Sequence, residues 1–319
     1  MNTEIKHIHH AGHVVTDMSA ALELYKKLGF VCLTPAYPLM AEKEGEEPKT
    51  LGVANTHITF LRNFVEIATV VKEGVKIPED AKMVPIQVPS AALPLVLQNI
   101  KRTVDTVSSC LARFEGTHIL CFYSPDVEAS AARFDKNGIG HSGVNPVQRP
   151  IETTEGVKVL SLKVLEIDGE DVPEGRLAIA DIPPLETLQA QTHMDHPNGA
   201  IELVEVILCA ADTEIDDFTK RYQRYLGCDV KVDGAARIFD MENARITIVP
   251  GSHLNRILSG EAVPDLPAFA GYVVKVRDIS MTHKYIESNG FQVKETPQGD
   301  IFVPASTALG TAIVFRQAR

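Results

Sequence analysis

The sequence lacks the clustered lysines and arginines with which nucleic-acid-binding proteins contact phosphate groups. Its 31 Lys and Arg residues are outnumbered by 42 Asp and Glu residues, and the formal net charge is −11 at pH 7. A chain without a basic face attracts neither a polyanion nor an anionic membrane surface. We therefore expect neither nucleic acid nor a membrane among its partners.

Long apolar runs and paired cysteine motifs are also missing. No apolar stretch approaches the ~20 residues that a membrane-spanning helix needs, and residues 1–6 contain no hydrophobic signal-peptide region. The five cysteines are scattered and form no Cys-x-x-Cys motif; they are Cys32, Cys110, Cys121, Cys209 and Cys228. Such a set favours buried free thiols in a reducing compartment, so we expect a cytoplasmic protein.

Several catalytic signatures are absent as well. The sequence has no GxxxxGK[ST] loop for phosphates and no GxSxG nucleophile elbow. Gly138-Ile139-Gly140 lacks the rest of a dinucleotide-binding motif and follows a helical pattern, not a strand. An enzyme with this sequence would therefore depend on a metal ion or on the acids and bases of a binding cavity.

What the sequence does contain is a fourfold repeat. An apolar strand ends in Asp, a helical pattern follows, and Gly closes the unit. The copies run from Asp17 to Gly29, from Asp126 to Gly138, from Asp212 to Gly227 and from Asp278 to Gly290; the third spacing is 15 residues and the others are 12. Asp suits the N-terminus of a helix and Gly the left-handed residue at its end. The recurrence predicts four strand–helix–strand units.

Two further patterns suggest how the units are grouped. A helical pattern begins at Ser90 and interrupts the repeat, so we expect a helical insertion over about residues 88–114. Residues 182–200 are rich in Pro, Asn and Gly turn signals. We place a boundary there and expect two domains, residues 1–197 and residues 198–319.

Three stretches carry a resemblance to a known family: residues 10–17, residues 52–55 followed by residues 64–70, and His196-Pro197-Asn198-Gly199-Ala200. With them the chain resembles the vicinal-oxygen-chelate superfamily of glyoxalases, extradiol dioxygenases and bleomycin-resistance proteins, especially its glyoxalase-like domain proteins. The resemblance implies an α+β fold. Four βαβββ modules would pair into two glyoxalase-like domains, whose mixed sheets form cups around a binding site.

The resemblance also implies metal ligands on the first and last strands of a module, at His10 and Glu66. The residues support this pair, because strand alternation places His10 on the face opposite His9 and His13. Glu66 lies within an apolar strand, where a buried carboxylate requires a partner. That partner could be a divalent metal, or instead a His or Arg with no metal bound.

A third ligand is less evident, and several metals fit equally well. Asp181, at the end of the second module's last strand, is the candidate; His118 and His193 are weaker ones. The ligand types do not distinguish Zn, Fe, Mn, Ni or Mg, and a metal-free site stays open. The half from residue 198 has Glu205, Thr247, Gly271 and Ala312 at the aligned positions, so we expect no metal there.

Two functions of different class follow. In the first, a metalloenzyme acts on a small oxygenated substrate by lyase, isomerase or dioxygenase chemistry. Its metal chelates two substrate oxygens, Glu66 doubles as a proton acceptor, and Asn55 and His57 hydrogen-bond the substrate. In the second, a metal-free protein binds a small molecule in the cup, as bleomycin-resistance proteins do. A homodimer is an open alternative in both cases.

Overall fold

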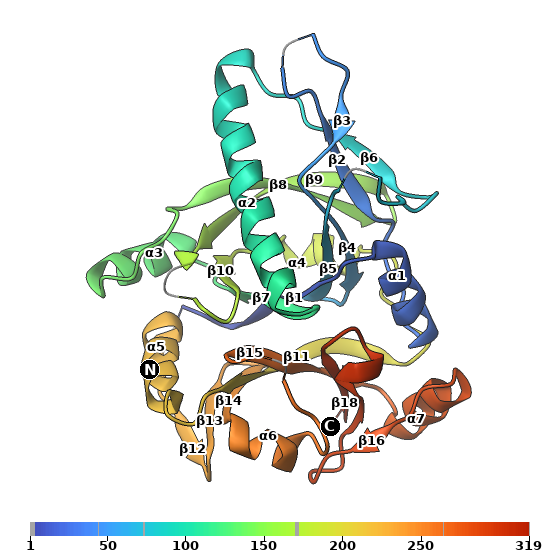
Figure 1. The fold of residues 1–319 in the computed structure, drawn as a ribbon, viewed down its shortest axis with the longest axis vertical. Helices are drawn as coiled ribbons and strands as arrows, with labels where there is room; N and C mark the ends of the chain where they lie inside the picture. Colours follow the sequence, from blue (N-terminus) through green and yellow to red (C-terminus); the bar gives the residue numbers. More distant parts are fainter. Residues whose placement is uncertain (1–3, 44, 73, 170–171, 264, 319) are drawn as a thin grey trace.

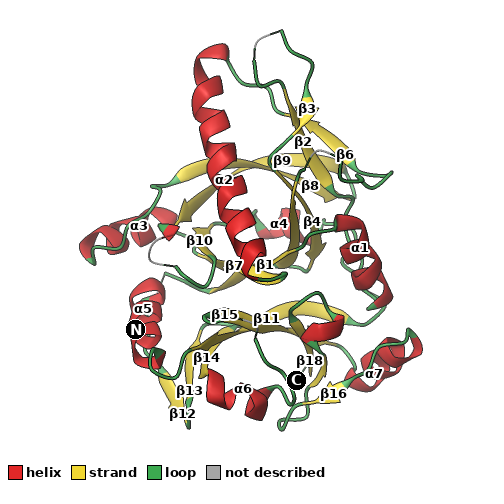
Figure 2. Cartoon of the chain, in the orientation of Figure 1, coloured by secondary structure: helices red, strands yellow, loops and turns green. Residues whose placement is uncertain are grey.

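The computed structural model describes residues 4–43, 45–72, 74–169, 172–263 and 265–318. The chain has the expected α+β fold, in which helices flank a continuous mixed sheet of 18 strands (Figures 1 and 2). None of the described helices is long and apolar enough to cross a membrane.

The described first half of the chain contains ten strands and four α-helices, one of which is long and crosses the sheet (Figure 1). In chain order the elements are β1 (His7–Val14), α1 (Met18–Lys27), β2 (Ala36–Met40), β3 (Lys49–Thr50), β4 (Val53–Thr59), β5 (Phe64–Val70), β6 (Lys82–Pro85), the 3-10 turn η1 (Ser90–Ala92), α2 (Leu93–Arg113), β7 (Gly116–Tyr123), α3 (Val127–Lys136), β8 (Asn145–Thr153), β9 (Gly156–Glu166), β10 (Arg176–Ala180) and α4 (Leu185–Gln189).

The second half repeats this order of strands and helices, with fewer elements inserted into it. Its elements are β11 (Ala200–Ala210), α5 (Ile215–Leu226), β12 (Lys231–Asp233), β13 (Ala236–Asp240), β14 (Arg245–Pro250), α6 (Gly251–Ile257), β15 (Ala268–Val276), α7 (Ile279–Ser288), β16 (Lys294–Glu295), β17 (Ile301–Val303), the 3-10 turn η3 (Ala305–Thr307) and β18 (Ala312–Gln317).

Strand pairing follows one rule in all four repeats. The first strand of each repeat pairs in parallel with its last strand: β1 with β5, β7 with β10, β11 with β14 and β15 with β18. Consecutive repeats then join through antiparallel pairs, β1 with β7 and β11 with β15. The strand order in the first half is therefore β6-β2-β4-β5-β1-β7-β10-β9-β8, with the short β3 also paired with β2. This order brings residues distant in sequence onto one sheet face.

The Asp and Gly of the repeat act largely as predicted. Asp17, Asp126 and Asp278 cap α1, α3 and α7 with their carboxylates, and all four closing glycines have positive φ. The prediction for Asp212 is wrong. Helix α5 begins after Glu214, and Asp212 Oδ1 accepts from the backbone N–H of Ser252 at the start of α6. The longer spacing of the third copy reflects this difference.

Helix α2 is the expected insertion, and it packs on the concave face of the first sheet. Its Val107 lies in an apolar cluster with Val14 of β1, Ala68 of β5 and Ile119 of β7. The flanking helices α1 and α3 contribute instead to the main core on the opposite face, through residues such as Tyr25 and Phe134. Helix α2 therefore covers part of the cup and leaves the rest to polar side chains.

The two halves meet through buried polar contacts as well as apolar ones. Thr117 of β7 pairs with Phe269 of β15, and the Tyr25 and Tyr272 hydroxyls hydrogen-bond at 2.8 Å. His13 Nε2 also forms a hydrogen bond of 2.7 Å with the carbonyl oxygen of Leu309 in the second half. We propose a domain boundary between residues 197 and 198, in the turn that precedes β11.

Candidate active site

A one-residue bulge in β1 brings two adjacent histidines together. Ile8 pairs with Phe122 of β7 and His10 pairs with Cys121, so His9 is an additional residue in the ladder. The Nδ1 atoms of His9 and His10 share a hydrogen bond of 2.7 Å. The prediction that His9 faces away from His10 is therefore wrong, because a bulge interrupts the side-chain alternation.

Glu66 on β5 lies beside His10, as the strand alternation predicts. His10 Nε2 is 3.7 Å from Glu66 Oε2, and the neighbours Val65 and Ile67 lie in the core on the other face. Asn55 Nδ2 donates a hydrogen bond of 2.7 Å to Glu66 Oε1, which fixes the carboxylate against β4.

Burial determines the charge states of this pair. Desolvation lowers the pKa of His10 well below its ordinary value, and the nearby charge of Arg149 lowers it further. Desolvation raises the pKa of Glu66, against the opposing effects of the Asn55 hydrogen bond and the charges of Arg176 and Arg149. The imidazole is therefore neutral near pH 7, which is the form that binds metals or accepts protons.

His57 lies directly opposite Glu66 in the β4–β5 pair. Burial lowers the pKa of His57 to about 3, so this ring is also neutral. His57 meets the ring of Phe64 edge-on, with the centroids 4.6 Å apart, and His10 stacks on Phe64 at the same separation. The Phe64 ring thus contacts both imidazoles.

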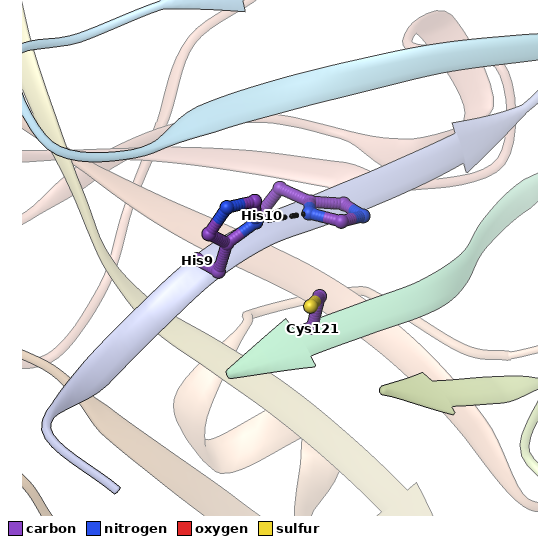
Figure 3. A group of neighbouring side chains, drawn as sticks. All are labelled: His9, His10 and Cys121. Atoms are coloured by element: carbon purple, nitrogen blue, oxygen red, sulfur yellow. Dashed lines mark hydrogen bonds between the residues drawn. The ribbon is translucent and has the colours of Figure 1, made fainter. Parts of the chain in front are cut away.

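Cys121 is a site residue that the sequence assigned only to the core. Ligand atoms of His9, His10 and Cys121 all lie within 4.8 Å of one another, and Figure 3 shows the two imidazoles on β1 above the Cys121 sulfur on β7. Desolvation raises the pKa of this thiol strongly, so it is protonated without a metal. The β1–β7 register that places it here cannot be read from local sequence.

Asp181 does not join His10 and Glu66. Its Oδ1 accepts from the backbone N–H of Lys163 at 2.8 Å, and among the described residues the group with metal-binding spacing is His9, His10 and Cys121. The physical reason is the position of Asp181 beyond Ala180, where β10 ends. The two weaker candidates also have other partners: His118 Nε2 bonds to Phe114 O, and His193 lies 3.5 Å from Glu152.

Two arginines of the second module complete the cup, and sequence reasoning missed both. Arg149 on β8 lies with its Cζ 4.3 Å from the centroid of the Phe64 ring. Arg176 at the start of β10 donates from Nε to Glu166 at 2.8 Å. Neither has a local motif; only the pairing of distant strands brings them to Glu66.

The corresponding region of the second half is built differently. Glu205 on β11 is buried; its Oε2 accepts a hydrogen bond of 2.7 Å from Arg316 and forms an ion pair with Arg245 at 2.8 Å. The concave face carries apolar residues packed against Leu254 and Leu258, in and just after α6. The second cup is thus filled by its own side chains.

Comparisons with known proteins agree with this architecture. The family model described as "Glyoxalase-like domain" matches residues 8–226. A hypothetical protein from Staphylococcus aureus superposes with a TM-score of 0.59 at 11% identity, over 98% of this chain and 100% of that chain. A mutant of 4-hydroxymandelate synthase from Streptomyces coelicolor gives a TM-score of 0.59 at 13% identity, over 98% and 92% of the two chains.

A third similar structure is a fusion of a xylose isomerase-like TIM barrel with a 4-hydroxyphenylpyruvate dioxygenase. Its TM-score is 0.54 at 9% identity, and the match covers 99% of this chain and 50% of that chain. At such identities these structures show a shared fold and not a shared reaction. No curated protein sequence matches the chain significantly.

Proposed function

Because the chain belongs to the family of glyoxalase-like domain proteins, we propose that the cup of its first half is the active site of an enzyme for a small oxygenated molecule, assisted by a divalent metal ion. The observation that carries this proposal is the 3.7 Å approach of His10 Nε2 to Glu66 Oε2 on one polar face. The reaction class is lyase, isomerase or dioxygenase chemistry.

The donor set fits such an ion. A neutral imidazole and a carboxylate are ligands for first-row divalent metals, and a thiol favours zinc or iron among them. Within the described chain Glu66 forms no ion pair with an arginine, so its carboxylate remains available. We propose His10 and Glu66 as ligands, without Asp181; Cys121, which forms a separate group with His9 and His10, is the alternative partner of His10.

When bound, a divalent ion would act as a Lewis acid toward two substrate oxygens. Glu66 is suited to accept a proton from the substrate, since burial raises the pKa of its carboxyl toward the working pH. Asn55 positions that carboxylate through its hydrogen bond of 2.7 Å, and the neutral His57 ring is placed to hydrogen-bond the substrate. The apolar cluster beneath α2 excludes water from one side.

A metal-free binding protein is the second candidate. The observation that favours it is the pair of guanidinium groups, because the charges of Arg149 and Arg176 both act on Glu66 and oppose the entry of a cation. In that case the cup would hold a small molecule without transforming it, as bleomycin-resistance proteins do.

Metal analysis separates the two candidates. Protein purified without a His tag is soaked in Zn²⁺, Mn²⁺, Ni²⁺ or Fe²⁺ and desalted, and its metal content is measured by mass spectrometry. We expect close to one equivalent in the wild type and a loss of at least tenfold in affinity for His10→Ala, since a lost ligand or its support costs ~10–100-fold.

The matched control is His283→Gln on the exposed surface of α7, which should bind metal like the wild type. Absence of metal from the soaked wild type, or equal uptake by His10→Ala, would contradict the metalloenzyme and leave the binding protein as the function.

A further inference from the structure

Arg149 is a cation of the cup that forms no ion pair or hydrogen bond with a carboxylate in the described chain, although the charge of Glu66 acts on it. Within the described chain its guanidinium group makes a cation–π contact with Phe64, whose ring centroid lies 4.3 Å from Arg149 Cζ. Arg176, its neighbour in the cup, is satisfied by Glu166. A guanidinium group carries five N–H donors, and on the half-buried Arg149 side chain they are left to solvent or to a ligand.

A small recess opens beside this guanidinium. Besides Arg149 it is lined by residues that include His57, Thr59, Glu152 and Thr192. Thr59 is only 5% exposed, and its buried hydroxyl has no hydrogen-bond partner in the described chain. Buried hydroxyl groups are nearly always satisfied, so a second donor without an acceptor lies at the same recess.

The charges around the recess fix the charge of its occupant. Glu152 also lines it, but that carboxylate is already paired with Lys82 and lies 3.5 Å from His193. Burial lowers the pKa of Arg149 to about 10, which still leaves it cationic at pH 7. The positive charge of Arg149 therefore faces the recess with no carboxylate in contact, although the charge of Glu66 acts on it from the cup, and it suits a ligand with a single negative charge.

We propose that the mouth of this recess, whose volume is about 20 Å³, binds the carboxylate of a small organic acid, with Arg149 as a two-pronged anchor and one carboxylate oxygen reaching inward to the Thr59 hydroxyl. The planar guanidinium fork matches the two oxygens of a carboxylate. A phosphate dianion would bring more charge than Arg149 offers, next to the Glu152 carboxylate. This inference rests on the proposed function, because it names the substrate class of the same cup.

The Phe64 ring contacts both Arg149 and a proposed metal ligand. Its centroid lies 4.3 Å from Arg149 Cζ, and it stacks on His10 with centroids 4.6 Å apart. An acid held at Arg149 is therefore one aromatic ring away from His10, beside which Glu66 lies.

Calorimetric titration of the full chain tests the anchor. Chelator-treated, metal-free protein is titrated with pyruvate and with benzoate, and with pyruvamide and inorganic phosphate for comparison. Arg149→Met should weaken binding of the carboxylates about 10–100-fold, the range of charge-assisted hydrogen bonds. Arg149→Lys should recover only part of the loss, because an ammonium lacks the planar fork. Arg277→Met, at an exposed ion pair with Asp195, is the matched control and should bind normally.

Thr59→Val provides a second test that does not depend on a charge change. Removing a buried hydroxyl without a partner should raise the midpoint of thermal unfolding of the free protein, whereas it should weaken carboxylate binding about fivefold. A role in folding alone would not separate stability from binding in this way.

The outcomes distinguish the anchor from the metal site. Carboxylate binding that Arg149→Met abolishes while its metal uptake stays normal supports the anchor. Equal binding by Arg149→Met and wild type, tighter binding of phosphate or pyruvamide than of pyruvate, or no binding of either carboxylate at millimolar concentration overturns it. Normal carboxylate binding in a wild type that takes up no metal leaves the anchor standing and removes the metalloenzyme.

Discussion

At the scale of single residues, the site combines a buried acid with neutral bases. Glu66 is the residue whose protonation has the clearest consequence for stability. Because desolvation raises the pKa of its carboxyl in the folded protein, the folded state binds this proton more tightly than the unfolded chain does. Stability from this group is present below pH 4.5 and is lost as the pH rises through the folded pKa, so near pH 7 the ionised carboxylate destabilises the fold.

Glu66→Gln should therefore stabilise the metal-free protein at pH 7. The amide removes the buried charge and can still accept from Asn55 Nδ2. We expect a gain on the order of 1 kcal/mol in the free energy of unfolding, measured in urea, and a smaller gain at pH 4. A loss of stability at pH 7 would mean that the charge of Glu66 is fully compensated by Arg149 and Arg176.

Sequence reasoning reached some of these residues because their signals are local. His10 and Glu66 follow from strand alternation and from an acid within an apolar strand. His9 was assigned to the wrong face, since a bulge depends on the register with β7. Arg149 joins the site across a separation of 85 residues from Phe64, through strand pairs that no local pattern specifies.

At the scale of elements, the insertion helix α2 is the addition that most changes the cup. It lies on the concave face, where Val107 is fully buried against Val14, Ala68 and Ile119. Near its start, Leu95 is 61% exposed. The helix therefore docks through its C-terminal turns.

Val107→Ala should destabilise the protein by about 1–3 kcal/mol, because it removes buried methyl groups and leaves a cavity. Leu95→Ala, the control on the exposed part of the same helix, should change stability by less than about 0.5 kcal/mol. Urea denaturation compares the two variants. Equal losses would contradict the docking of α2 on the cup.

The existence of α2 could be predicted from sequence, but its position could not. Apolar residues at helical spacing after Ser90 indicate a helix of about the observed length. Which face of the sheet it covers depends on Ala68 and Ile119, which lie on two different strands. Similarly, Asp212 resembles the other three capping residues in sequence, yet its carboxylate serves α6 because α5 starts later.

At the scale of the whole molecule, buried neutral histidines tie stability to pH. Burial lowers the pKa of His13 and of His118 to about 4, and that of His57 to about 3. The unfolded chain takes up these protons near pH 6.5, whereas the folded protein does not. The stability they contribute is complete above pH 6.5 and is lost progressively as the pH falls toward 4.

The free energy of unfolding should therefore fall steeply between pH 6.5 and pH 5, by roughly 1 kcal/mol per pH unit for each such histidine. His118→Gln should reduce that slope by about one histidine's share, while its amide can still donate to Phe114 O. His283→Gln, on the exposed face of α7, serves as the control. A slope unchanged by His118→Gln would contradict a neutral, buried His118.

The overall architecture was the most predictable property of the chain. Four copies of one pattern specify four strand–helix–strand units, and the pairing of β1 with β5 and of β7 with β10 repeats within each. Because the same pattern occurs four times, the wrong capping prediction for Asp212 did not change the predicted fold. The site has no such redundancy, because each of its side chains occurs once.

The bulge at His9 also has a genetic consequence. An additional residue in a strand arises by insertion of a codon, and no substitution can create or remove it. Deleting His9 would restore regular pairing, with Ile8 still opposite Phe122 and His10 still opposite Cys121. The paired imidazoles would be lost in one mutational step while the core position of Ile8 stayed, so the second imidazole can be lost without disturbing the sheet.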